Sequence, residues 1–116
     1  HLNFKTDVTY NVFGPVRPWD NRNDNVRDGL RQAMAQNPYL KVLIQSGYYD
    51  GATTYFNAKY TMWQIDPSGR MKDRFYFKGY RSGHMMYLRS EDLKKSNDDL
   101  RDFIKNSSSK GKAAKY

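Results

Sequence analysis

The two residues of this chain best suited to chemistry are a carboxylate and an imidazole, Asp50 and His84. A carboxylate that accepts a hydrogen bond from one imidazole nitrogen fixes the tautomer of the ring and leaves the other nitrogen free as a base. Glycines at Gly47, Gly51 and Gly83 suit the tight turns that would present both side chains. Asp50 and His84 therefore predict general-base chemistry if the fold brings them together.

Composition excludes several other kinds of reactive centre. The chain contains no cysteine and 2 histidines, His1 and His84. It can therefore hold neither a disulfide framework nor a thiolate nucleophile, and it cannot form a thiolate or histidine-rich metal site. We expect no metal and no cofactor.

The segments before Asp50 and His84 both have the pattern of a strand. Branched apolar residues fill positions 39–46 almost continuously, which predicts a strand covered on both faces. Residues 73–80 alternate and are rich in aromatics, and residues 53–65 between the two segments have helical spacing. Strands joined by such a helix are parallel, so their carboxyl ends meet at one edge of the sheet, where α/β proteins bind ligands. We expect Asp50 and His84 to lie side by side at that edge.

Both residues also have a purely structural interpretation. An aspartate just after a strand is often a turn or capping residue, and a histidine beside glycine often has a structural role. Spacing alone leaves the two interpretations open.

Two further helices complete the predicted order of helix, strand, helix, strand, helix, which is that of an α/β fold. The first shows helical spacing from Val26 to Met34 and stops at Asn37-Pro38. The last begins at Ser90, and its apolar residues are expected to face a core. They are Leu93, Leu100, Phe103 and Ile104.

The 116 residues are enough for one domain with a modest core, given 38% apolar residues and 16% aromatics. We expect this domain to span residues 1–105, with an irregular lead-in at 1–18, and a basic flexible tail at 106–116. No apolar run approaches the about 20 residues that a membrane-spanning helix needs.

The net charge of +8 raises the alternative of a non-enzymatic basic module that binds nucleic acid or an acidic partner. Four lysines and no acid occur from Lys105 to Tyr116, so half of the net charge falls in these last twelve residues. A nucleic-acid interface would interleave basic and aromatic residues on one face. We therefore expect no specific nucleic-acid partner.

Three stretches resemble serine carboxypeptidases of the bacterial type. Residues 37–44 leading into Gly-Tyr-Tyr-Asp-Gly-Ala-Thr at 47–53 resemble the segment of that family that bears its acid. Gly-His-Met-Met-Tyr at 83–87 resembles the segment that bears its histidine, and residues 14–19 are also similar. The similarity covers about nine-tenths of the chain, as far as Ile104.

The resemblance implies the C-terminal part of an α/β-hydrolase fold with a triad in the chain order Ser, Asp, His. Asp50 would be the triad acid, His84 the general base, and Met85 would line the pocket for the leaving residue of a peptide substrate. It also implies a secreted or periplasmic protein. Thr54 departs from the family, in which proline is common at this position.

The nucleophile of such a hydrolase is absent, because Gly-x-Ser-x-Gly occurs nowhere in the sequence. We therefore expect a fragment of a serine-type carboxypeptidase that is inactive alone and whose natural partner is the upstream part of the same enzyme. Another α/β-hydrolase chemistry, such as ester hydrolysis, is the alternative within this fold. Because two strands alone leave open apolar edges, we also expect the isolated piece to self-associate.

Overall fold

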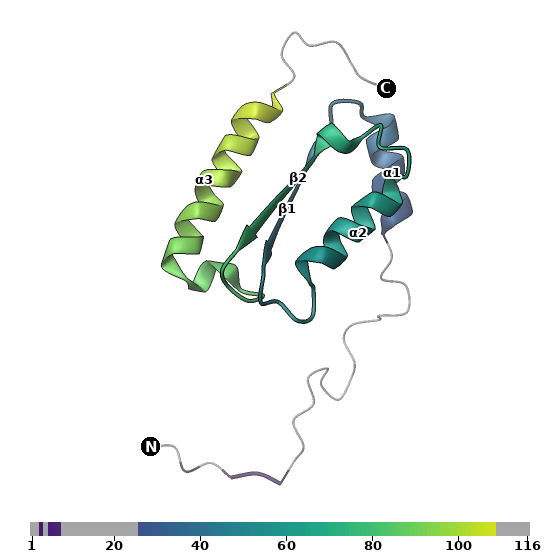
Figure 1. Cartoon of the computed structure of the whole chain (residues 1–116). Coiled ribbons are helices and arrows are strands. Elements are labelled where there is room, and N and C mark those ends of the chain that lie inside the picture. Colours follow the sequence, from purple (N-terminus) through teal and green to yellow (C-terminus); the bar gives the residue numbers. More distant parts are fainter. Residues whose placement is uncertain (1–2, 4, 8–25, 109–116) are drawn as a thin grey trace.

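The computed structural model describes residue 3, residues 5–7 and residues 26–108. Its helices and strands follow the predicted order (Figure 1). They are α1 (Arg27–Gln36), β1 (Val42–Gly47), α2 (Tyr55–Ile65), β2 (Phe75–Tyr80) and α3 (Ser90–Ser107), with short 3-10 helices η2 (Lys72–Arg74) and η3 (Met86–Leu88). The predicted lead-in at 1–18 falls almost wholly outside the described residues, as does the similar stretch at 14–19.

The two strands form a parallel sheet in which Val42 lies opposite Phe75 and Gly47 opposite Tyr80. Helix α2 is the crossover between them. Helix α3 lies on one side of the sheet and α1 and α2 lie on the other, so the described part has three layers (Figure 1). This arrangement brings the carboxyl ends of both strands to the same end of the sheet.

Both strands begin later than their patterns predicted. Residues 39–41 precede β1, because a turn follows α1 in which the Leu40 N–H donates to the carbonyl of Asn37 at 3.0 Å. Residues 73 and 74 belong to η2, and the Arg74 guanidinium donates to the carbonyls of Met34 and Asn37 at the end of α1. These bonds hold the end of α1 against the start of β2.

Helix α2 begins at a side-chain cap. The Thr54 hydroxyl accepts from the Asn57 N–H at 3.3 Å, which satisfies one of the free donors of the first turn. Thr54 therefore serves as a helix cap where the resembling family commonly has proline. At the other end, the Asp66 carboxylate accepts from the N–H groups of Arg70 and Met71 and holds the following turn.

Helix α3 faces the sheet with a different stripe from the one its apolar residues predicted. Asp92 and Ser96 are buried, whereas Leu93, Leu100 and Ile104 are 43%, 41% and 63% exposed. Of the four apolar residues expected to face a core, Phe103 alone is half-buried, and its ring packs on Tyr76 edge to face with centroids 5.4 Å apart. Asp92 is paired locally with Arg89, whereas the Ser96 carbonyl and the Asp99 carboxylate face hydrogen-bond partners on the sheet.

Those partners centre on Tyr80, which is 1% exposed at the end of β2. Its hydroxyl donates to Asp99 Oδ2 at 2.9 Å and accepts from Gln45 Nε2 at 2.8 Å. Gln45 also donates to the carbonyl of Ser96, and Lys78 pairs with Asp99. Burial, and then the Asp99 carboxylate, raise the pKa of Tyr80 to about 12, so the hydroxyl stays neutral and joins β1, β2 and α3.

The last helix ends at Ser107, so Asn106 and Ser107 belong to α3 and not to the predicted tail. Lys41 Nζ donates to the carbonyl of Asn106 at 2.7 Å, which satisfies one of the free acceptors of the last turn. Residues 109–116 lie outside the described part.

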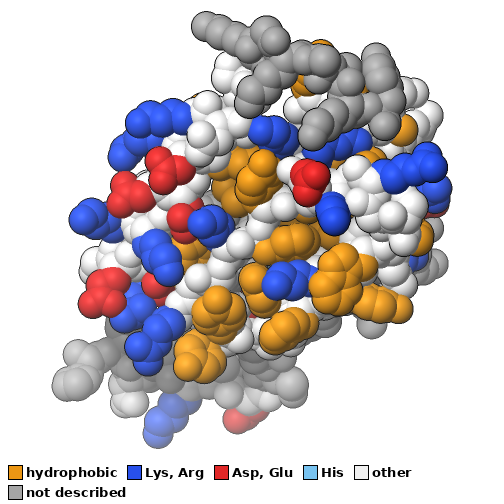
Figure 2. Space-filling view, turned by 45° about the horizontal axis from the view of Figure 1, so that its top comes forward, with side chains coloured by type: hydrophobic (Ala, Val, Ile, Leu, Met, Phe, Trp, Pro, Cys, Tyr) orange, Lys and Arg blue, Asp and Glu red, His pale blue; other side chains and the backbone are white. Residues whose placement is uncertain are grey.

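Large apolar side chains remain at the surface, and Figure 2 shows hydrophobic groups gathered on one face beside the charged side chains. On α2, Phe56, Tyr60 and Trp63 form an exposed stripe. Strand β1 is half-buried and not fully covered, and within the described residues β1 and β2 pair only with each other. Self-association stays a prediction. No helix in the described part is long and apolar enough to cross a membrane.

We expect Tyr80→Phe to lower the free energy of unfolding by about 1–2 kcal/mol, because it leaves the amide of Gln45 and the carboxylate of Asp99 each short of a partner. Urea denaturation measures the change. Tyr60→Phe is the matched control, since the Tyr60 side chain is 57% exposed to water. Equal effects of the two substitutions would contradict the role given to Tyr80.

Candidate functional site

The candidate site is built where the backbone pairing of the two strands continues past their ends. The Tyr48 N–H donates to the carbonyl of Tyr80 at 2.8 Å, and the Tyr49 N–H donates to the carbonyl of Ser82 at 3.0 Å. The loops after β1 and β2 are therefore joined by hydrogen bonds. The second of these bonds joins the residue just before Asp50 to the residue two positions before His84.

A glycine lets these loops approach so closely. A Cβ atom on Gly47 would lie 2.2 Å from the carbonyl oxygen of Gly83 and 2.3 Å from that of Ser82, which is far inside van der Waals contact. Gly79 plays a similar part, because a Cβ there would lie 2.3 Å from the Tyr48 ring. Residues without a side chain at these positions thus fix the distance between the two loops.

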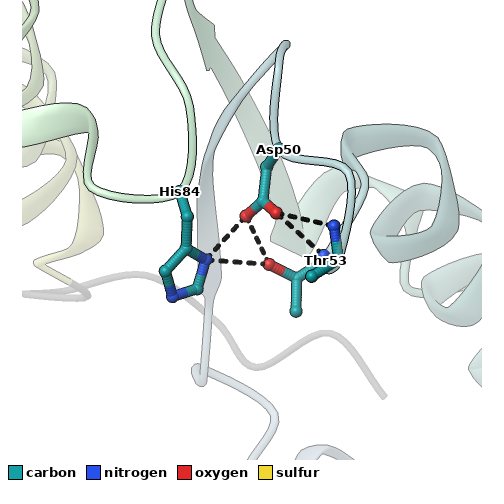
Figure 3. Close-up of polar contacts among 4 residues, drawn as sticks. Asp50, Thr53 and His84 are labelled. Atoms are coloured by element: carbon teal, nitrogen blue, oxygen red, sulfur yellow. Dashed lines mark hydrogen bonds and ion pairs between the residues drawn. The ribbon is translucent and has the colours of Figure 1, made fainter. Parts of the chain in front are cut away.

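His84 Nδ1 lies 2.7 Å from Asp50 Oδ2 (Figure 3). The prediction that the sheet brings these two side chains together is confirmed. The Asp50 side chain is only 5% exposed, whereas the His84 side chain is 71% exposed. The carboxylate is therefore shielded, and the ring that it contacts faces outward.

A turn of the following residues holds the Asp50 carboxylate. Oδ1 accepts from the N–H groups of Ala52 at 3.0 Å and Thr53 at 2.9 Å, and Oδ2 accepts from the Thr53 hydroxyl at 2.5 Å (Figure 3). Hydrogen bonds from the Thr53 hydroxyl and N–H, then from His84 and Ala52, favour the ionised form. They hold the pKa of Asp50 well below its ordinary value of 3.8, although burial alone would raise it.

This ionisation state determines the arrangement of protons. An ionised carboxylate only accepts hydrogen bonds, so Nδ1 of His84 must be the donor in the contact with Asp50. In the neutral ring the proton is then on Nδ1, and Nε2 has a free lone pair. The pair can take a proton from a hydroxyl or a water placed at Nε2, and Asp50 stabilises the positive charge that results.

Met85, the third residue singled out from the sequence, directly follows His84 and is 50% exposed at the start of η3. It follows the base in the chain, and nothing in the geometry of the described residues assigns it a role. Thr53 is the site residue that sequence reasoning missed. The available signal was a hydroxyl residue three positions after an aspartate, a spacing at which an aspartate carboxylate bonds its own turn.

A cavity of about 400 Å³ lies at the opposite end of the sheet. It is lined by the last turns of α1 and α2 and by the residues that precede β1 and β2, among them Met34, Pro38, Ile65 and Arg74. Asp50 and His84 do not line it. We place the candidate site at the Asp50–His84 contact, because that is where reactive groups converge.

Comparison of the chain with protein-family models, with curated proteins and with solved structures finds no match.

We expect Gly47→Ala to push the Ser82–Gly83 backbone away, since the added Cβ meets carbonyl oxygens that cannot yield without moving the loop. Unfolding free energy should fall by about 1–3 kcal/mol, the usual cost of overpacking, and the ring resonances of His84 should shift. Urea denaturation and NMR measure the two effects.

Gly51→Ala is the matched control, because a Cβ at that position would meet no atom within 4 Å. If both variants preserved the wild-type His84 resonances, the close approach of the loops would not control the site.

Acid should remove the stability that ionised Asp50 contributes. Because its pKa is lower in the folded chain than in the unfolded chain, this contribution is complete above about pH 5 and falls as the pH drops below the ordinary value of 3.8. The difference in unfolding free energy between wild type and Asp50→Asn should shrink from pH 5 towards pH 2. Asp102→Asn, at an exposed position of α3, is the control. A difference that grows with acid would contradict the bonding described for Asp50.

Proposed function

We propose that this chain supplies the acid and the base of a Ser–Asp–His triad, and that the polypeptide to which it belongs is a serine-type carboxypeptidase with an α/β-hydrolase fold. Asp50 is the triad acid and His84 is the general base. The nucleophilic serine comes from a segment outside this sequence.

The observation that carries the proposal is the 2.7 Å contact between Asp50 Oδ2 and His84 Nδ1. A carboxylate that orients an imidazole through Nδ1 is the part that serine hydrolases share, whatever their fold. The mixed helix and strand architecture, with both residues after the carboxyl ends of parallel strands, is compatible with that setting. The buried acid and the exposed ring suit the two roles, because the base must reach the nucleophile and the acid need not.

In the proposed reaction, Nε2 of His84 takes the proton from the serine hydroxyl as the oxygen attacks the carbonyl of a C-terminal peptide bond. The ring then gives that proton to the leaving amine, and in the second half of the reaction it activates a water. Met85 lies next to the base in the sequence and contributes an apolar surface for the departing residue. The choice of peptide over ester rests on the resemblance of residues 47–53 and 83–87.

The 116-residue chain should hydrolyse neither peptide nor ester above background and should not react with a fluorophosphonate probe, because the base has no nucleophile to activate. A polypeptide that joins this sequence to its nucleophile segment should react. In it, His84→Ala should lower kcat by about 10⁶-fold and Asp50→Asn by about 10⁴-fold. Steady-state hydrolysis of C-terminally blocked and unblocked peptides, and of matched esters, gives these values.

Asp102→Asn, at an exposed position of α3 remote from the contact, is the control and should leave kcat unchanged. Hydrolysis of esters but not of peptides would replace the carboxypeptidase with an esterase on the same triad. Full activity in both the His84 and Asp50 variants would overturn the proposal.

A further inference from the structure

Among the described residues, the Thr53 side chain hydrogen-bonds with both members of the pair. Its hydroxyl oxygen lies 2.5 Å from Asp50 Oδ2 and 3.2 Å from His84 Nδ1 (Figure 3). The three side chains therefore form a closed triangle of polar contacts, in which Asp50 and His84 are 2.7 Å apart.

Only one arrangement of protons satisfies all three contacts. Ionised Asp50 accepts and cannot donate, so the Thr53 hydroxyl gives its proton to Oδ2. Its oxygen then offers a lone pair to the proton on His84 Nδ1, which is shared between the carboxylate and the hydroxyl. If the ring proton were on Nε2 instead, Nδ1 would be an acceptor and would face the carboxylate oxygen Oδ2 of Asp50, which is also an acceptor.

The backbone of Thr53 reinforces this arrangement. Its N–H donates to Oδ1 at 2.9 Å while its hydroxyl donates to Oδ2, so one residue binds both oxygens of the carboxylate and prevents its rotation. The side chain is held in turn, because α2 begins two residues later at the cap formed by Thr54. Without the hydroxyl, the carboxylate would keep its backbone bonds at Oδ1 and its contact with His84 at Oδ2, but would lose the bond that ties Oδ2 to its own turn.

We infer that Thr53 is a positioning residue, which fixes the orientation of the Asp50 carboxylate and selects the His84 tautomer with the proton on Nδ1. The inference rests on the proposed function for its catalytic consequence, but the tautomer itself is a property of this chain. Thr53 does not touch the reacting atoms, since its hydroxyl lies on the Nδ1 side of the ring and the base is Nε2.

The test is Thr53→Val in the full 116-residue chain, which keeps the branched shape and removes the hydroxyl. NMR of the His84 ring gives the fraction of the Nδ1–H tautomer and the rate at which the Nδ1 proton exchanges with water. The variant should exchange about tenfold faster and should populate the Nε2–H tautomer, because a hydrogen bond to a charged group is lost. Thr53→Ser should restore the wild-type values.

Thr54→Val is the matched control, as the same substitution at the next position. It removes the α2 cap and should lower the melting temperature, but it should leave the His84 proton unaffected. The inference is overturned if Thr53→Val has wild-type tautomer and exchange, or if Thr54→Val changes them equally.

Hydrolysis separates this inference from the proposed function. In the polypeptide that carries the nucleophile, Thr53→Val should lower kcat about 10-fold or more with little change in KM, and Thr53→Ser should rescue it. A shifted tautomer without any hydrolysis would mean that Thr53 positions a pair that is not a triad. Hydrolysis could instead depend on His84 and not on Thr53, with an unchanged His84 tautomer in Thr53→Val. That result would uphold the proposed function and overturn the positioning role of Thr53.

Discussion

The structure depends on the parallel pairing of β1 and β2 and on its continuation beyond the strand ends. Two hydrogen bonds, from the Tyr48 and Tyr49 N–H groups to the carbonyls of Tyr80 and Ser82, join the loops that follow the strands. Because the backbone is fixed this close to both side chains, a carboxylate and an imidazole remote in sequence meet at 2.7 Å. The site is therefore a consequence of strand register, and a change of register would separate the pair.

Local hydrogen bonds then convert proximity into a defined chemical state. The turn from Asp50 to Thr53 satisfies both carboxylate oxygens, and it keeps the acid ionised although it is nearly buried. An ionised acceptor beside Nδ1 assigns the ring proton to that nitrogen and leaves Nε2 basic. His84 remains accessible, so the base can meet a group that approaches from outside the described residues. The division between a shielded acid and an exposed base suits the proposed function, in which the nucleophile comes from another segment.

The sequence predicted the order of helices and strands, and with it the meeting of Asp50 and His84, because periodicity and parallel connection depend only on local pattern. It did not predict which side of α3 faces the sheet. Leu93 and Leu100 are exposed and Ser96 is buried, because α3 turns towards the sheet the side on which the Ser96 carbonyl accepts from Gln45 and Asp99 accepts from the Tyr80 hydroxyl. The role of Thr53 was also missed, since a hydroxyl near an aspartate has no distinctive pattern until the turn closes.

Strand pairing places Asp50 against Nδ1 of His84 and leaves Nε2 as a free base. The direct measurement is the pair of ¹⁵N chemical shifts of the His84 ring in wild type and in Asp50→Asn, at a pH where the ring is neutral. This placement predicts a protonated Nδ1 and an unprotonated Nε2 in wild type, and the reverse in Asp50→Asn, whose amide can donate to Nδ1. A protonated Nε2 in wild type, or identical shifts in both proteins, would contradict it.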